Sequence, residues 1–429
     1  KFNINYICIL HLCDRFYSVT KMMYQFATLL ALVPMVFGFT TPFTGRSTSF
    51  TSNRAVYQPV SAGKTYSTRL SDLKAKLADG ESVVLIGVAA DSGCGKSTFM
   101  RRLTGMFGTE GVQMLGGGFG NGGWETNTLV SETTTVICLD DYHLNDRNGR
   151  KVTGRTALDA AENNFDLMFE QLKDLKDGKT IKKPIYNHVN GTLDTPEEVE
   201  PTPIVIVEGL HPFYDDRVAE LLDFTVYLDI SDEIKFAWKI QRDMEERGHS
   251  LESIKASIEA RKPDFDAFVA PQRSKADIVL QVLPTKLVEG ETDGKILRVK
   301  MIQKEGSDVF SPAYLFDEGS TIEWTPCGKK LACSYPGIKL AYGPDVFMDN
   351  EVSVLEMDGE FENLQELVYV ESHLSNIGTK FFGELTQNLV KMANSPGSNN
   401  GTGFFQTLTA LKLREVYEKI TQKEVVLSE

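Results

Sequence analysis

Residues 93–98, Gly-Cys-Gly-Lys-Ser-Thr, combine the residue types that bind the phosphates of a nucleotide. They follow an apolar run, Val83 to Val88, that predicts a buried parallel strand, and a helical pattern comes directly after them. In such a strand–loop–helix unit the backbone N–H groups of the loop and of the helix N-terminus face the phosphates. Lys96 would add a point charge for the β- and γ-phosphates, and Ser97 would offer its hydroxyl to Mg²⁺.

One position departs from the usual phosphate-binding loop, G-x-x-x-x-G-K-[ST]. Its first glycine is replaced by Ala90, which is small enough to fit where the backbone keeps a negative φ. A glycine-rich hairpin turn is the alternative interpretation, but Lys-Ser-Thr directly after a buried strand disfavours it. The residues expected to bind the phosphates of ATP are Gly93, Cys94, Gly95, Lys96, Ser97 and Thr98.

Acidic side chains follow two further apolar runs. Thr133–Leu139 is followed by Asp140, and Ile204–Val207 is followed by Glu208. Because ligands of parallel sheets lie beyond the carboxyl ends of the strands, we expect both carboxylates to lie close to Lys96. A kinase needs a carboxylate that deprotonates the acceptor hydroxyl and another that holds a metal ion.

The alternation of strands and helices in the first half predicts an α/β protein: a P-loop kinase fold with a mixed, mostly parallel sheet and a C-terminal β/α extension. The expected domains are a kinase core over 67–275 and a β/α region over 276–429 that completes the sheet. Further expectations are a mobile glycine-rich loop over 105–123, a solvated acidic loop over 196–201, and closing helices around 362–392 and 404–421.

The N-terminal segment differs in kind from the rest. No Asp or Glu occurs from Arg15 to Ser71, and an apolar stretch, Phe26 to Phe39, precedes a Ser/Thr-rich stretch, Thr40 to Ser52. This order of a signal-peptide-like and a transit-peptide-like segment resembles the bipartite presequences of complex plastids. Residues 1–60 are therefore expected to be removed, which leaves a mature protein of the plastid stroma without a membrane anchor; an anchor retained in the mature protein is the alternative.

Charge and motif content narrow the class of protein. The 429 residues carry a formal net charge of −14, which disfavours nucleic acid as a partner because its phosphates demand a basic face. A regulatory GTPase would contain Asn-Lys-x-Asp, which is absent from the chain, and no helicase-type element indicates a motor. A small-molecule kinase remains. The alternative is a catalytically idle scaffold, which the intact Lys96, Asp140 and Glu208 disfavour.

Seven segments, taken together, indicate a family. They are Ala89–Arg102, Ile137–His143, Lys183–His188, Val207–Pro212, Gln241–His249, Glu259–Phe265 and Cys327–Gly337. In this colinear order, from about residue 80 to the end, the chain resembles the phosphoribulokinases of plants and algae, a P-loop kinase family related to uridine kinase. Uridine kinases share the P-loop, Lys-Pro-x-Tyr and Glu-Gly elements, so the regulatory cysteines and the whole C-terminal half distinguish the two families.

The resemblance implies a reaction and roles for individual residues. The γ-phosphate of ATP would pass to the C1 hydroxyl of ribulose 5-phosphate in the presence of Mg²⁺. Asp140 would be the base, with Lys96 and Asp243 completing the catalytic set, and Arg261 would contact ATP. Metal ligands would be Ser97, Glu208 and Asp243. Residues for the sugar phosphate would be His143, Arg147, Lys151, Tyr186, His188, Lys239, Arg242 and Arg247.

Simpler interpretations stay open for several of these residues. Asp140 could merely cap the next turn, and Asp243 with Arg247 could form a solvated ion pair on one helix face. Arg261 could be an ordinary cation at a helix C-terminus. The histidines could be structural. Asp141, next to the expected base, is expected to be structural or to bind water.

The cysteines raise the question of redox control. Cys94 and Cys138 flank the expected site, Cys327 and Cys333 form a C-x₅-C pair, and these four permit three pairings. The resemblance implies a regulatory Cys94–Cys138 disulfide reduced by thioredoxin, and a second pair, Cys327–Cys333. A helix N-terminus and Lys96 would favour the Cys94 thiolate, so Cys94 is expected to be the reactive thiol. The alternative is a small loop filler at Cys94 and an ordinary strand residue at Cys138. The resemblance also implies a homodimer and a plastid complex with glyceraldehyde-3-phosphate dehydrogenase.

Overall fold

The computed structural model describes residues 83–91, 93–107, 113–115, 128–130, 133–245, 250–291, 294–316, 318–325 and 333–427. They belong to one unit, Ser61–Glu429, which is distinct from Lys1–Val60. The expected presequence, most of the glycine-rich segment, Arg247 and Cys327 therefore lie outside the described residues. The backbone of Lys239, Arg242 and Asp243 is described, but their side chains are not.

In the described part of the chain, eleven strands form one sheet with the order β12-β13-β14-β10-β9-β8-β1-β7-β4-β3-β2. Its parallel core consists of β4 (Thr134–Cys138), β7 (Ile204–Gly209), β1 (Val84–Ala90), β8 (Phe224–Ile230) and β9 (Ile278–Pro284). Every residue of β4, β7, β1 and β8 is buried, as the continuous apolar runs predict for strands covered on both faces. The expected α/β fold with a mixed sheet is confirmed, and the core of this sheet is parallel.

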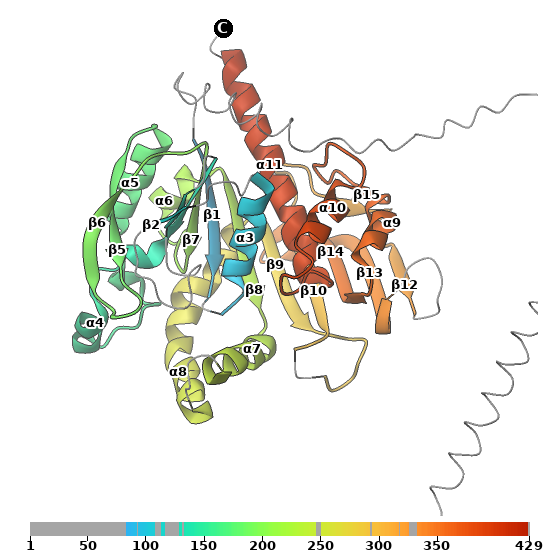
Figure 1. Ribbon diagram of the computed structural model, residues 1–429, viewed down its shortest axis with the longest axis horizontal. Helices are drawn as coiled ribbons and strands as arrows, with labels where there is room; N and C mark the ends of the chain where they lie inside the picture. Colours follow the sequence, from blue (N-terminus) through green and yellow to red (C-terminus); the bar gives the residue numbers. More distant parts are fainter. Residues whose placement is uncertain are drawn as a thin grey trace, which may run out of the picture. The chain divides into compact units, whose positions relative to one another are not determined.

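Helices cover both faces of this core. Alternate residues of β1 such as Val84 and Ile86 pack into the same apolar cluster as α3 (Lys96–Phe107) and α11 (Gly401–Leu427). Leu85, on the opposite face, packs with α5 (Phe165–Lys176) and α6 (Asp216–Leu221). Figure 1 shows α11 running beside α3 across one face of the sheet. The C-terminal helix thus covers the helix that follows the P-loop.

Antiparallel strands extend the sheet on both sides. After β9 come β10 (Leu297–Lys304), β14 (Asn350–Phe361), β13 (Cys333–Phe347) and β12 (Thr321–Trp324), and at the other edge β3 (Thr128–Val130) and β2 (Gln113–Leu115). Smaller elements are α4 (Arg147–Thr153), α7 (Asp232–Glu245), α8 (Leu251–Asp264), β11 (Tyr314–Leu315) and β15 (Leu374–Ser375). Strands from both sides of residue 276 share this one sheet. Among the described helices, none is both long and apolar enough to span a membrane.

Three expectations about elements are wrong. The segment 105–123 is not a single loop, because α3 continues to Phe107 and Gln113–Leu115 form β2. The segment 362–392 is not one helix: α9 (Leu367–Glu371) and α10 (Glu384–Lys391) are separated by a link in which Gly378 and Gly383 adopt positive φ. The acidic run is not a loop, because residues up to Val199 belong to β6 (Leu193–Val199), which pairs with β5 (Ile181–Tyr186). This hairpin is a separate two-stranded sheet.

Candidate active site at the carboxyl edge of the sheet

The P-loop turns sharply between β1 and α3. Gly93 and Gly95 have φ angles of 84° and 72°, in the left-handed region that favours glycine. The N–H of Phe99 donates to the carbonyl of Gly95 at 3.1 Å, so the first helical turn closes directly behind the loop. A cavity of about 580 Å³ lies against this turn and is lined by Gly93, Gly95, Ser97 and Thr98 together with Trp238 and residues 396–397.

Three strand ends bring the predicted catalytic groups together. Glu208 of β7 pairs in register with Val88 of β1 and with Cys138 of β4. Lys96 Nζ lies 2.5 Å from Glu208 Oε2. Burial opposes the charge on Lys96, but Glu208, Cys138 and Asp140 together outweigh this effect, so the pKa of Lys96 is raised and its ammonium stays charged. The expected proximity of Lys96 and Glu208 is confirmed.

Asp140 lies on the turn that follows β4, in a short 3₁₀ helix over Leu139–Tyr142. His143 Nε2 and His188 Nε2 are each 3.9 Å from one of its carboxylate oxygens. Burial alone would raise the pKa of Asp140, but the charges of His143, His188, Lys96 and Arg261 lower it to about 2. Its carboxylate is therefore ionised over the whole physiological pH range.

Aromatic and basic side chains surround this carboxylate. The Tyr186 ring stands edge-on to His143 and His188, with centroid distances of 5.5 and 4.9 Å. Arg150 donates to the Tyr186 hydroxyl at 2.7 Å. Arg147 donates to the carbonyl oxygen of His188 at 2.8 Å. The expected sugar-site residues His143, Arg147, Tyr186 and His188 thus lie around Asp140.

The remaining residues predicted to bind the sugar phosphate lie on α4 and α7, and the structure describes them to different extents. Lys151 is exposed on α4, the helix that also carries Arg147. Lys239, Arg242 and Asp243 lie on α7, and their direction toward the site is not described. Arg247 lies beyond the described end of this helix.

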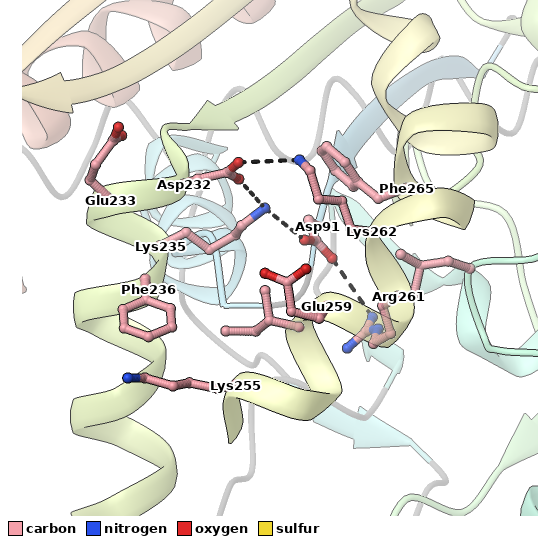
Figure 2. Close-up of a pocket in the computed structure, with 12 residues that line it drawn as sticks. Asp91, Asp232, Glu233, Lys235, Phe236, Lys255, Glu259, Arg261, Lys262 and Phe265 are labelled. Atoms are coloured by element: carbon pink, nitrogen blue, oxygen red, sulfur yellow. Dashed lines mark hydrogen bonds and ion pairs between the residues drawn. The ribbon is translucent and has the colours of Figure 1, made fainter. Parts of the chain in front are cut away.

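A second cavity, of about 510 Å³, lies between α7, α8 and the start of the P-loop. Figure 2 shows Asp91 between Lys235 and Arg261, and Lys262 paired with Asp232. The carboxylate oxygens of Asp91 lie 3.3 Å from Lys235 Nζ and 3.7 Å from a guanidinium nitrogen of Arg261, and Lys262 Nζ lies 3.4 Å from Asp232. Arg261, expected on the ATP side, is therefore joined by an ion pair to the P-loop. Acidic and basic side chains both line this cavity.

The expectation of a reactive Cys94 thiolate is wrong for this structure. Cys94 and Cys138 are both buried free thiols. Burial raises the pKa of Cys94 to about 12, and the negative charges of Asp91 and Asp229 add to that effect against Lys235 and Lys96. Burial likewise raises the pKa of Cys138 well above its usual value. Cys333 is also buried, and its Sγ donates to the carbonyl of Trp324 at 3.7 Å.

Potential metal ligands occur in two sets. The Ser97 hydroxyl and the Glu208 carboxylate are hard oxygen donors, which suit Mg²⁺. Ligand atoms of Cys138, Asp140 and His188 also lie within 4.8 Å of one another. A thiol and an imidazole suit softer metals, so only the oxygen donors fit the metal expected from the sequence.

Several residues of the site were not predicted individually from the sequence. Lys183 is buried against Asp141 and Glu197, Arg150 contacts Tyr186, and Lys235 reaches Asp91. Lys183 could have been found from the alternating burial of its strand, in which it lies on the same buried face as Ile181. A buried lysine needs a carboxylate partner. Asp141 is buried in this ion pair, so the expectation that it is structural is confirmed.

This arrangement defines a P-loop kinase. The lysine of a glycine-rich loop contacts a carboxylate at a strand end, and an aspartate flanked by cations lies beside them. Residues 85–289 match the model of the phosphoribulokinase / uridine kinase family. Among curated proteins, the chain is 65% identical to a chloroplastic phosphoribulokinase of Chlamydomonas reinhardtii over 81% of this chain and 92% of that one. It is 64% identical to that of Spinacia oleracea (79% and 83%) and 60% identical to a phosphoribulokinase of Synechocystis (81% and 97%). The chain belongs to the phosphoribulokinase family.

Proposed function

We propose that the protein is a phosphoribulokinase, which transfers the γ-phosphate of ATP to the C1 hydroxyl of ribulose 5-phosphate and gives ribulose 1,5-bisphosphate. The observation that carries the proposal is the meeting of Lys96, Glu208 and Asp140 at adjacent strand ends in a chain with about 60–65% identity to phosphoribulokinases. The reaction places this enzyme in the Calvin cycle.

Asp140 accepts the proton of the C1 hydroxyl as that oxygen attacks the γ-phosphorus. Its low pKa makes it a weak base but keeps it ionised, which suits a loose transition state where the hydroxyl proton leaves late. Lys96 neutralises charge on the β- and γ-phosphates. The P-loop glycines, with Cys94, Ser97 and Thr98, place the phosphates at the N-terminus of α3.

Ser97 and Glu208 are the proposed ligands of Mg²⁺, with Asp243 of α7 as a further carboxylate. A bound Mg²⁺ draws charge from the phosphate oxygens. Glu208 Oε2 is buried and contacts the Lys96 ammonium, so the lysine and the metal would share this carboxylate.

The sugar phosphate is proposed to lie on the side of Asp140 that carries the histidines and arginines. His143, Tyr186 and His188 contact the sugar hydroxyls, while Arg147 and Lys151 on α4 bind the 5-phosphate. Lys239, Arg242 and Arg247 are the proposed cations for the phosphates, and Arg261 is the proposed contact to ATP. Arg261 would first have to exchange Asp91 for the nucleotide.

Redox control and assembly are extensions of the same proposal. A Cys94–Cys138 disulfide would join the P-loop to the strand of the base and block ATP, and thioredoxin would reduce it; Cys327 and Cys333 form the second candidate pair. A homodimer and a complex with glyceraldehyde-3-phosphate dehydrogenase are the proposed assemblies. Two of the relatives are named chloroplastic, which supports a plastid location; a complex plastid, reached through a bipartite presequence in residues 1–60, is the finer proposal.

A coupled assay that measures ADP release tests the activity. The protein is offered ATP with ribulose 5-phosphate, uridine or pantothenate in parallel. Phosphorylation of ribulose 5-phosphate alone supports the proposal. Uridine phosphorylation would instead indicate the related uridine kinase activity, and no turnover with any acceptor would indicate the idle scaffold.

A further inference from the structure

The hairpin of β5 and β6 carries two residues of the proposed sugar site yet is not part of the main sheet. It forms a separate two-stranded sheet, so no backbone ladder joins it to the strands that carry Asp140 and Glu208. Tyr186 ends β5, and His188 follows two residues later. One backbone bond, from the Arg147 N–H to the Gly191 carbonyl at 2.8 Å, joins the hairpin turn to α4, and side-chain contacts position the strand that carries Tyr186.

Asp141, the neighbour of the proposed base, makes the deepest of these contacts. One of its carboxylate oxygens accepts from the backbone N–H of Tyr186 at 2.7 Å. The other accepts from the ammonium of Lys183 in a short hydrogen bond. A single carboxylate therefore holds residues 183 and 186 of the strand against the turn that carries Asp140.

All three N–H donors of the Lys183 ammonium have acceptors in this arrangement. Besides Asp141 it donates to the carbonyl of Pro184 at 2.9 Å, and it lies 3.2 Å from Glu197 on β6. An ammonium has three N–H donors, so three acceptors satisfy it. Lys183 is 1% exposed, and a buried lysine of this kind is tolerated only when it is paired.

The local backbone explains how the lysine and the tyrosine face the same side. The pairing of β5 with β6 shifts register between Lys183 and Ile185, where Pro184 interrupts the strand. A bulge of this kind re-aims the side chains that follow it. After the bulge Ile185 and Tyr186 are both buried, and the Tyr186 ring meets His143 and His188.

We infer that Lys183 and Asp141 are positioning residues, whose buried ion pair fixes Tyr186 and His188 against Asp140 and so sets the affinity for the acceptor sugar. The inference rests on the proposed function. Other contacts also reach the hairpin: Arg150 and Arg147 bind it from α4, and Gln171 Nε2 donates to the Lys182 carbonyl at 2.7 Å. Arg147 is exposed and Arg150 only partly buried, so neither replaces the buried pair.

The test compares two equally buried lysines. Lys183→Met is measured beside Lys412→Met; Lys412 is 0% exposed on α11 and is bound by Glu415 and the Ser311 carbonyl at 2.9 and 2.7 Å. Both variants are expected to lower the thermal midpoint. Only Lys183→Met is expected to raise the KM for ribulose 5-phosphate, by about tenfold or more, while the KM for ATP stays within about threefold.

If Lys183→Met does not fold, Asp141→Asn and the double variant Asp141→Asn/Lys183→Met are measured in its place. The double variant removes both charges together, which buried pairs tolerate better than the loss of one partner. Its sugar KM is still expected to be raised, because the turn and the strand are no longer joined by the ion pair. Lys183→Arg, which keeps the charge, should recover part of the loss.

Two results would overturn the inference. One is a wild-type sugar KM in the double variant; the other is a Lys183→Met enzyme that, like Lys412→Met, is less heat-stable but has unchanged KM values. Failure of the proposed function is distinct, since the wild-type protein itself would then not phosphorylate ribulose 5-phosphate. If another acceptor is found, the same KM comparison is made with it.

Discussion

At the scale of single residues, the proposed base and the proposed phosphate site depend on the same cations. Against burial, His143 and His188 lower the pKa of Asp140 most, and Lys96 and Arg261, which would bind the anionic substrates, add to this effect and bring it to about 2. The folded-state pKa lies below the ordinary value of 3.8, so this carboxylate stabilises the fold at neutral pH and loses that contribution only as the pH falls toward about 2. Protonation of Asp140 therefore does not lower the enzyme's activity at any pH above about 4.

Asp140→Asn is expected to lower turnover by a factor of at least about 10² and to leave ATP binding unchanged. The amide is nearly isosteric but cannot take the hydroxyl proton. Turnover is measured in the coupled assay and ATP binding by calorimetry. Asp174→Asn, which changes an exposed carboxylate on α5, is the control. Near-full turnover of Asp140→Asn would show that another group accepts the proton.

Cys94 is expected to react slowly with iodoacetamide at pH 8 and faster as the pH rises. A pKa of about 12 leaves little thiolate at pH 8, and the side chain is only 5% exposed. Mass spectrometry of peptides alkylated between pH 7 and 10 measures the rate at each cysteine. Rapid alkylation at pH 7 would mean that the P-loop opens in solution and that the thiolate forms in the open state.

At the scale of elements, the sequence predicted what local patterns determine. The strand, loop and helix around Lys96 lie within one continuous segment, and their burial and turn chemistry are visible there. The acidic strand β6 was missed because its stability comes from pairing: Glu197 and Glu198 face Lys183 and Lys182 of β5 in register. The raised pKa of Cys94 could not be predicted from local sequence because burial of the thiol in the fold is its main cause, to which Asp91 and the distant Asp229 add.

Gly95→Ala is expected to raise the KM for ATP by about tenfold or more. A Cβ at Gly95 meets no atom within 4 Å, so the cost is the left-handed backbone, about 1–3 kcal/mol, and its relief would move the loop. Gly178→Ala is the matched control, since this glycine has a φ of 75° and equally open space but lies in the turn before β5. Both variants should lose similar stability by thermal denaturation. Equal ATP KM values in the two would contradict the assigned role of the loop.

At the scale of the whole molecule, the unit that contains the site is separate from Lys1–Val60. The family match begins at residue 85, and the described site residues all lie beyond residue 90. A protein that starts at Ser61 is therefore expected to keep full turnover and the same KM values. The coupled assay on the full and shortened chains measures this. An inactive shortened chain with a lowered thermal midpoint would show that residues 1–60 contribute to the fold.

A buried arginine of the P-loop helix also forms hydrogen bonds to the loop that precedes the C-terminal helix. Arg102 of α3 is 2% exposed and donates to the Pro396 carbonyl at 3.0 Å and to the Ser398 hydroxyl at 2.8 Å. Pro396 and Gly397 line the cavity beside the P-loop, together with Ser97 and Thr98. Burial lowers the pKa of Arg102 to about 10, which still leaves the guanidinium charged at neutral pH.

Arg102→Met is therefore expected to lower the free energy of unfolding by about 1–3 kcal/mol and to raise the KM for ATP severalfold, because the 396–398 loop loses its contact with α3. Arg414→Met is the control: Arg414 of α11 bonds Glu384 at 2.9 Å and the carbonyl of Gly378 at 2.9 Å, none of which lines that cavity. Urea denaturation and steady-state kinetics measure the two effects. An unchanged ATP KM in Arg102→Met would show that the C-terminal loop stabilises the fold without shaping the nucleotide site.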